Sequence, residues 1–321
     1  MKLFKIIPSG YCKGVVRAIN IAKRTALDNP DKQIYILGMI VHNSYVTQAL
    51  NQYNIITLSD TFKSKYELLD EIDDGIVIFT AHGIADDIVR YAKNKGLETI
   101  DATCFDVLVT KNNIIEKLNE GFEVLYIGKF KHPEAEAITS LSNKVHLITN
   151  LSDVDKIDIN TNNIYVTNQT TMSIFEIADI FDKIKNRFPN VIIEEEICSA
   201  TRMRQEAVIE NKDVDLLYVV GDVKSNNSNK LRDIAIQQGI KNVYLISSVK
   251  EINENQLKNV SNIAITAGAS TPTYLTNQVY TTIQNYMNTK KLLIPEINIG
   301  DILWYPLYYF INIDIFVFSN I

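Results

Sequence analysis

Short runs of consecutive apolar residues recur along the chain, and each run ends at a glycine or a threonine. Those ending at glycine are Ile34 to Gly38, Val124 to Gly128 and Tyr218 to Gly221, and those ending at threonine are Ile76 to Thr80, Ile164 to Thr167 and Ile263 to Thr266. Runs this short, rich in Ile, Val and Tyr, are typical of parallel strands that are buried on both faces. They predict sheets covered by helices.

Stretches with helical periodicity lie between these runs. Val15, Ile19 and Ala22 fall on one face of a helix, and residues 175–188 form another amphipathic stretch that ends before Pro189. Strands that alternate with helices in this way predict an α/β fold with mostly parallel sheets.

The three cysteines suggest an internal repeat. Cys12, Cys104 and Cys198 are separated by 92 residues (12 to 104) and 94 residues (104 to 198), and a helical stretch follows each of them. We therefore expect three α/β units, at 1–103, 104–197 and 198–290, followed by an apolar tail at 291–321. The alternative is one irregular α/β domain in which the spacing is accidental.

Composition narrows the class of protein. The chain has 321 residues, of which 46% are hydrophobic and 22% charged, with a net charge of −6. This composition argues against long disorder and against a large nucleic-acid interface. Three cysteines cannot all pair with one another, and the apolar run at the start is too short for a signal peptide. These features predict a cytoplasmic protein.

Three cysteines brought together from three repeats have a defined chemistry. Thiolates hold an iron-sulfur cluster or a zinc ion and can leave one coordination position for substrate. The alternative is that each cysteine is a small buried hydrophobic residue. The chain has no C-x-x-C pair, so a cluster would depend on the fold to bring its ligands together.

Polar residues follow the predicted strands, at the edge where parallel α/β sheets bind ligands. They include three of the four histidines and are His42, His82, His132, Glu134, Thr170, the segment Ser225 to Asn229, and Ser270. Hydroxyl, amide and imidazole donors suit a bound phosphate, as does the start of a helix, which we expect near Lys230. A carboxylate such as Glu134 supplies protons in many enzymes and caps helices in many other proteins.

The residues at these positions resemble the 4-hydroxy-3-methylbut-2-enyl diphosphate reductase family. The segments that carry the resemblance follow the family order over about residues 5 to 290, and they are Gly10 to Val15, Val41 to Asn43, Ala81 to Gly83, Asp101 to Cys104, His132 to Glu134, Gln169 to Thr171, Ile197 to Thr201, Arg204 to Ala207, Ser225 to Asn229 and Thr266 to Pro272. Many ordered matches are far more specific than any single motif.

The resemblance implies a trefoil of three pseudo-threefold-related α/β units around one cluster of four irons and four sulfides. Cys12, Cys104 and Cys198 would hold three irons, and the fourth would stay open for the substrate hydroxyl. The residues that would bind the diphosphate are His42, His82, His132, Ser225, Asn226, Asn227 and Ser270. Glu134 would deliver a proton, and Thr170 would position the hydroxyl and take part in the proton relay.

The implied activity is reductive dehydroxylation of an allylic diphosphate to isopentenyl and dimethylallyl diphosphate, the last step of the non-mevalonate pathway. The implied electron donor is a protein such as ferredoxin or flavodoxin. Two alternatives are a quinolinate-synthase-like cluster enzyme and a cluster-bearing sensor or scaffold without catalysis.

Some positions depart from the family pattern. Phe105 stands where proline is usual, Lys131 where glycine is usual, and Asn226 where a second serine is common. The tail from Asp301 to Ile321 is apolar but is interrupted by Pro306, and it is too short for a membrane span, so we expect a docked strand or a dimer contact there.

Overall fold

Parallel strands and covering helices form the fold in the computed structural model, which describes residues 1–159 and 161–304. The described strands make three four-stranded sheets, and the central strands of each sheet pair in parallel. The predicted fold class, α/β with mostly parallel sheets, is therefore confirmed. The expectation of a docked strand or dimer contact falls largely on 305–321, outside the described residues.

The first sheet has the order β3-β2-β4-β5. Its strands are β2 (Ile34–Leu37), β3 (Ile55–Leu58), β4 (Ile76–Phe79) and β5 (Glu98–Asp101), and the helices along this part of the chain are α2 (Ser44–Asn51), α3 (Lys65–Asp70) and α4 (Asp86–Asn94). All four residues of β4 are buried, as expected for a central parallel strand.

The second sheet has the order β7-β6-β8-β9. Its strands are β6 (Glu123–Ile127), β7 (Val145–Ile148), β8 (Ile164–Asn168) and β9 (Ile192–Ile193), and its helices are α5 (Phe105–Asn119), α6 (Pro133–Thr139), α7 (Leu151–Asp155) and α8 (Ile174–Arg187). Helix α8 confirms the amphipathic stretch predicted before Pro189.

The third sheet has the order β1-β12-β10-β11. Its strands are β1 (Lys2–Lys5), β10 (Leu216–Val220), β11 (Asn242–Ile246) and β12 (Asn262–Ala267), and the helices are α1 (Lys13–Asp28), α9 (Ser199–Glu210), α10 (Asn226–Gln237) and α11 (Thr273–Thr289), with 3-10 turns at Val249–Glu251, Glu254–Leu257 and Ile299–Asp301. The first strand of the chain thus pairs with the last one, Leu3 opposite Ile263.

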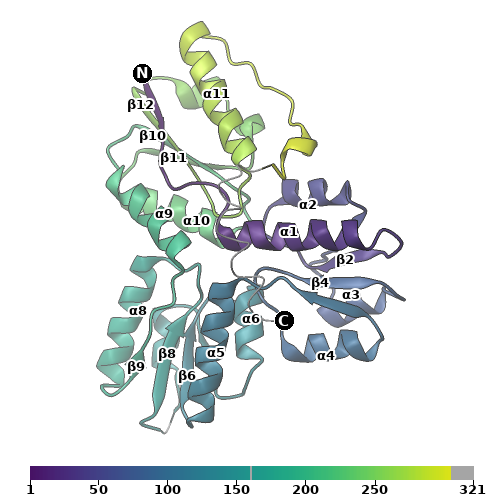
Figure 1. Ribbon diagram of the computed structural model, residues 1–321. Helices are drawn as coiled ribbons and strands as arrows, with labels where there is room; N and C mark the ends of the chain where they lie inside the picture. The colour runs from purple at the N-terminus through teal and green to yellow at the C-terminus, as the bar shows by residue number, and fades with distance from the viewer. Residues whose placement is uncertain (160, 305–321) are drawn as a thin grey trace. The chain divides into compact units, whose positions relative to one another are not determined.

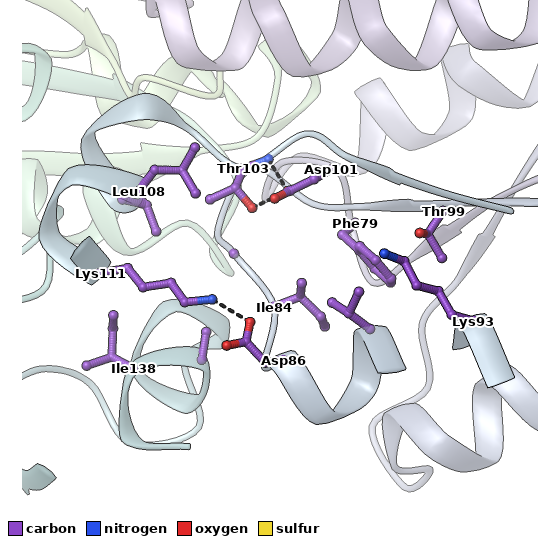
Figure 2. Close-up of a pocket in the computed structure, with 14 residues that line it drawn as sticks. Phe79, Ile84, Asp86, Lys93, Thr99, Asp101, Thr103, Leu108, Lys111 and Ile138 are labelled. Atoms are coloured by element: carbon purple, nitrogen blue, oxygen red, sulfur yellow. Dashed lines mark hydrogen bonds and ion pairs between the residues drawn. The ribbon is translucent and has the colours of Figure 1, made fainter. Parts of the chain in front are cut away.

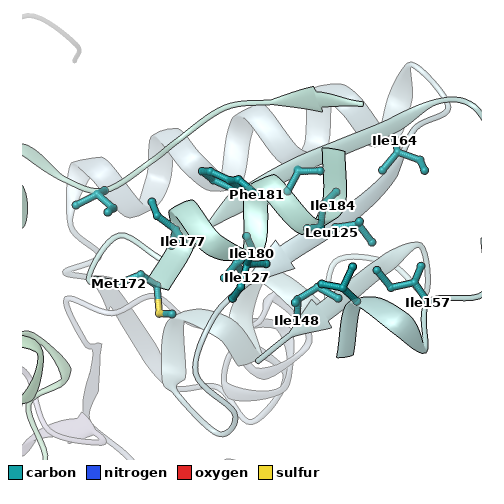
Figure 3. Packing of buried hydrophobic residues seen from close by; sticks show 13 residues of the cluster. Leu125, Ile127, Ile148, Ile157, Ile164, Met172, Ile177, Ile180, Phe181 and Ile184 are labelled. Carbon is teal, nitrogen blue, oxygen red and sulfur yellow. The ribbon is translucent and has the colours of Figure 1, made fainter. Parts of the chain in front are cut away.

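Side chains alternate across strand β6, and this alternation decides what each face contacts. Leu125 and Ile127 pack in a cluster with residues of α8, among them Ile180 (Figure 3). Val124 and Tyr126 point to the opposite face, where their cluster contains residues of α5 and α6. The sheet is therefore buried on both faces, and the α6 side is the one that carries Tyr126.

The described chain divides into two compact units, which we describe separately (Figure 1). The first comprises the described residues 1–30, 41–56 and 203–304, and the second comprises the described residues of 31–40 and 57–202. The boundaries 1–103, 104–197 and 198–290 stay a prediction from the cysteine spacing. No helix in the described parts of the chain is long and apolar enough to cross a membrane.

Candidate active site

Each of the three cysteines lies at the start of a helix. Cys12 is the N-cap of α1 and Cys104 the N-cap of α5. The carbonyl of Cys198 accepts the N–H of Arg202 at 3.0 Å, in the first turn of α9. Within the described residues none of the three forms a disulfide, and each is half-buried. Helix N-termini favour negative charge, so these positions suit thiolate ligands.

The donor set, three cysteines at helix starts, suits an iron-sulfur cluster, because such clusters are held by cysteine thiolates. Within the described residues, no three His, Cys, Asp or Glu side chains gather closely enough to hold one ion. The thiolates of a cluster bind different irons and need not gather in that way.

Glu134 is the central charged group of the second unit. It lies in the first turn of α6, and only 1% of its surface is exposed. Its Oε1 accepts the backbone N–H of Thr170 at 2.8 Å and the hydroxyl of Tyr126 at 3.1 Å, and its Oε2 accepts the hydroxyl of Thr170 at 2.9 Å. The structure thus brings the two predicted catalytic residues into direct contact.

Burial controls the protonation of this carboxyl group. Removal from water raises the pKa of Glu134 to about 7, against the opposing effect of hydrogen bonds from Thr170 and Tyr126. The negative charge of Asp106 on α5 adds a smaller upward contribution. A carboxyl group with a pKa near neutrality is suited to donate a proton.

Two histidines lie beside this carboxyl group. The rings of His82 and His132 meet edge to face, with centroids 5.6 Å apart. His132 is the N-cap of α6, and its Nδ1 accepts the backbone N–H of Glu134 at 3.2 Å. A neutral His132 therefore carries its proton on Nε2, as a donor.

Backbone hydrogen bonds join the two cysteines of the second unit to main-chain carbonyl groups at or next to these residues. The N–H of Cys104 donates to Ala81, the neighbour of His82, at 2.9 Å. The N–H of Cys198 donates to Thr170 at 3.1 Å. The second unit therefore holds one connected set of predicted residues, His82, Cys104, His132, Glu134, Thr170 and Cys198.

The other predicted residues form a connected set in the first unit. The hydroxyl of Ser270 donates to the carbonyl of His42 at 3.0 Å and lies 3.4 Å from Oγ of Ser225. The N–H of Cys12 donates to Ala269 at 3.0 Å. Because Ala269 precedes Ser270 in the chain, Cys12 joins the same set.

Helix α10 starts four residues earlier than the sequence indicated. Ser225 is its N-cap and accepts the N–H of Ser228 at 3.3 Å, so the helix begins at Asn226 and not near Lys230. Asn226 and Asn227 therefore lie in the first turn, 4% and 5% exposed. The polar side chains themselves form the helix start, where backbone N–H groups can bind an anion.

Two glycines make room for this helix start. A Cβ atom added at Gly221 or at Gly268 would collide with the side chain of Ser228, which is fully buried. The backbone of both strand ends therefore approaches α10 more closely than any other residue would allow.

A cavity of about 300 Å³ lies in the second unit beside the Cys104 loop (Figure 2). Asp101 accepts the N–H of Thr103 at 2.8 Å, and Lys111 forms an ion pair with Asp86 at 2.6 Å. The first contact lies at the loop between β5 and α5, which carries Cys104, and the ion pair joins α5 to α4. None of the predicted site residues lines the cavity.

The departures from the family pattern have local explanations. Phe105 is the first residue of α5, a position where proline loses no hydrogen bond, and its side chain is 72% exposed. Lys131 has a φ of +58°, in the left-handed region that favours glycine. Neither departure changes a predicted ligand.

Comparison with known proteins identifies the relatives of this chain. The family described as LytB protein matches residues 4–284. The chain belongs to the LytB family. This LytB-family chain is 47% identical over 289 residues to the 4-hydroxy-3-methylbut-2-enyl diphosphate reductase of Geobacillus sp. (strain WCH70), an alignment that covers 89% of this chain and 91% of that protein. It is 48% identical to the reductase of the same name from Bacillus thuringiensis (strain Al Hakam), with the same shares covered.

Solved structures agree with this LytB-family assignment. The E-1-hydroxy-2-methyl-but-2-enyl-4-diphosphate reductase of Plasmodium falciparum superposes with a TM-score of 0.82 at 31% identity, covering 98% of each chain. A second structure, an (E)-4-hydroxy-3-methyl-but-2-enyl diphosphate reductase, gives a TM-score of 0.62 at 27% identity, covering 89% of this chain and all of that one. The family resemblance read from the motifs is confirmed.

Sequence reasoning missed some residues of this LytB-family site. Tyr126 lies within a strand that is buried on both faces, and its hydroxyl donates to Glu134. A buried hydroxyl group needs a hydrogen-bond partner, and this requirement could have pointed to Tyr126 from the sequence. The close packing of Ser228 against Gly221 and Gly268 could not be predicted from the residues around Ser228. His146, the one histidine outside the predicted set, pairs with Glu123 at 2.5 Å.

Proposed function

We propose that this chain is a 4-hydroxy-3-methylbut-2-enyl diphosphate reductase. In this reaction the bond between C4 and its hydroxyl oxygen breaks, two electrons and two protons enter, and the oxygen leaves as water while isopentenyl and dimethylallyl diphosphate form. The observation that carries the proposal is the buried Glu134 in contact with Thr170, whose carbonyl also holds the loop of Cys198. Family membership and the named relatives support the same activity.

We further propose that Cys12, Cys104 and Cys198 hold one cluster of four irons and four sulfides and leave one iron without a protein ligand. When bound, such a cluster supplies the electrons and an electron-pair acceptor for the hydroxyl oxygen. Support comes from the three helix-start cysteines and the family resemblance. The cluster would receive its electrons from a protein such as ferredoxin or flavodoxin in the cytoplasm.

The protein side chains would bind the diphosphate and orient the substrate. His42, Ser225, Asn226, Asn227 and Ser270 of the first unit and His82 and His132 of the second provide hydrogen-bond donors for its oxygens. The start of α10 adds backbone N–H groups and a favourable dipole. Many donors with little excess positive charge suit a diphosphate that must be released as product.

Glu134 and Thr170 would move the proton. The carboxyl group is protonated over much of the neutral range because its pKa is about 7. Its Oε2 contacts the hydroxyl of Thr170, which can accept one proton while it donates another. A proton can thus pass from Glu134 through Thr170 to the departing hydroxyl.

Anaerobic purification with iron and sulfide analysis, followed by turnover with the allylic diphosphate and reduced viologen, tests the proposal. We expect close to four irons per chain and formation of both isomeric products. A protein that binds the cluster but releases neither product would contradict the proposed activity. Failure to bind pyrophosphate as a competitive ligand would contradict the diphosphate site.

A further inference from the structure

We propose that Tyr126 is a positioning residue for Glu134, which holds Oε1 as a hydrogen-bond acceptor so that the carboxyl proton stays on Oε2, facing Thr170. This inference rests on the proposed function, because it assigns a place to the proton that the reaction would use. Tyr126 acts through Glu134, whose Oε1 accepts the hydrogen bond of its hydroxyl.

The two oxygens of Glu134 have different partners. Oε1 accepts two hydrogen bonds, from the backbone N–H of Thr170 at 2.8 Å and from Tyr126 at 3.1 Å. A backbone N–H can only donate, so a proton on Oε1 would oppose it. Oε2 faces the hydroxyl of Thr170 at 2.9 Å, and this group can rotate to accept a proton. Protonation at Oε2 therefore keeps all three hydrogen bonds.

Packing fixes the position of the Tyr126 hydroxyl. The tyrosine is fully buried in β6, in the cluster that contains Ala135 and Ile138 of α6. Gly128 lies against its ring, because a Cβ atom at that position would come within 2.9 Å of Cε1. Any larger residue there would displace the ring.

Charged groups face this pair from several elements. Asp106 on α5 acts on Glu134, Glu196 acts on Tyr126, and His132 caps the helix that carries Glu134. Burial and the charge of Glu134 raise the pKa of Tyr126 well above its usual value, so its hydroxyl keeps its proton as a donor. Its hydrogen bond stabilises the ionised form of Glu134 and lowers the pKa of that carboxyl group.

The variant Tyr126→Phe tests the assignment. Infrared difference spectra of the anaerobically prepared protein follow the carboxyl group during a pH titration, with Glu134→Gln to assign the band. Loss of one donor should raise the pKa of Glu134 by about one pH unit. In viologen-driven turnover, the alkaline limb of the kcat profile should move in the same direction. The maximal kcat should fall by up to about tenfold, because Oε1 loses the donor that holds the carboxyl group in place, and KM should change little.

Tyr165→Phe is the matched control. Tyr165 lies on the same face of the same sheet, is fully buried, and donates to Glu194 at 2.9 Å instead of to Glu134. Its loss should cost packing and a hydrogen bond but leave the titration of Glu134 unchanged. Gly128→Ala, which keeps the hydroxyl but displaces the ring, should shift the titration as Tyr126→Phe does.

An unchanged Glu134 titration in Tyr126→Phe would overturn the inference, as would an equal shift in Tyr165→Phe. The infrared titration needs no turnover. A shift in a protein that does not reduce the diphosphate would support the role of Tyr126 and contradict the proposed function.

Discussion

At the scale of single residues, Glu134 combines burial with three hydrogen-bond donors. Burial favours the neutral acid, and the donors from Thr170 and Tyr126 favour the carboxylate. Burial has the larger effect, but the hydrogen bonds oppose it, so the pKa of Glu134 is about 7. A group balanced in this way can release a proton and recover it at neutral pH.

Replacing Glu134 by Gln should abolish most turnover while substrate binding survives. The amide keeps the size and part of the hydrogen bonding but carries no transferable proton. General acid catalysis is typically worth about 10² to 10⁴ in rate, and we expect a loss in kcat of that size, measured anaerobically with reduced viologen. Turnover within about threefold of wild type would leave Glu134 as a structural partner of Thr170 and Tyr126.

The same carboxyl group should make stability depend on pH. Its pKa is raised in the folded protein from 4.5 to about 7, so its proton stabilises the fold below about pH 4.5, and this stabilisation is lost as the pH rises to about 7. The loss is on the order of 3 kcal/mol.

Thermal unfolding of wild type and Glu134→Gln across this range measures the effect. The variant, which has no such group to titrate, should gain stability relative to wild type as the pH rises. A difference between the two proteins that is independent of pH would rule out the raised pKa.

At the scale of elements, the start of α10 depends on how closely two strand ends approach it. Ser228 packs against Gly221 at the end of β10 and Gly268 after β12. Close packing therefore places the polar first turn of the helix beside Ser270, which belongs to another loop.

Gly268→Ala should displace the start of α10 and weaken binding of the diphosphate. We expect the dissociation constant of pyrophosphate to rise by about 10- to 100-fold, as for the loss of one or two charge-assisted hydrogen bonds. Titration calorimetry measures this dissociation constant. Iron content should remain normal. Gly300→Ala is the control, because its added Cβ would meet only the side chain of Asn298. Equal effects in both variants would contradict the prediction.

At the scale of the whole molecule, each compact unit carries one part of the proposed site. Cys12 belongs to the first unit, and Cys104 and Cys198 belong to the second. The proposed diphosphate ligands are likewise divided between the units. The proposed chemistry therefore requires residues from both units.

Serine at any one of the three cysteines should reduce cluster content and turnover together, because a hydroxyl is a much poorer ligand for iron than a thiolate. Loss of a hydrogen-bond partner of a metal ligand already costs about 10- to 100-fold in affinity or activity, and loss of the ligand itself should cost at least as much. Iron analysis and turnover of Cys12→Ser, Cys104→Ser and Cys198→Ser check this. Variants that all keep wild-type iron and activity would eliminate the cluster.

The sequence by itself determined the fold class, the central strands and the cysteine positions at helix starts. These features are local, because a buried parallel strand needs only a short apolar run, and a helix needs only its periodicity and its ends. The family motifs also identified the candidate site residues without any coordinates.

Only the tertiary structure decided which of these side chains touch one another. The contact of Glu134 with Thr170 joins residues 36 apart in the chain, and that of Ser270 with His42 joins residues 228 apart. The partner of each Glu134 oxygen and the start of α10 depend on packing between such distant segments. The hydrophobic pattern along the chain does not specify that packing. The same apolar strand would form whichever polar side chain packed next to it.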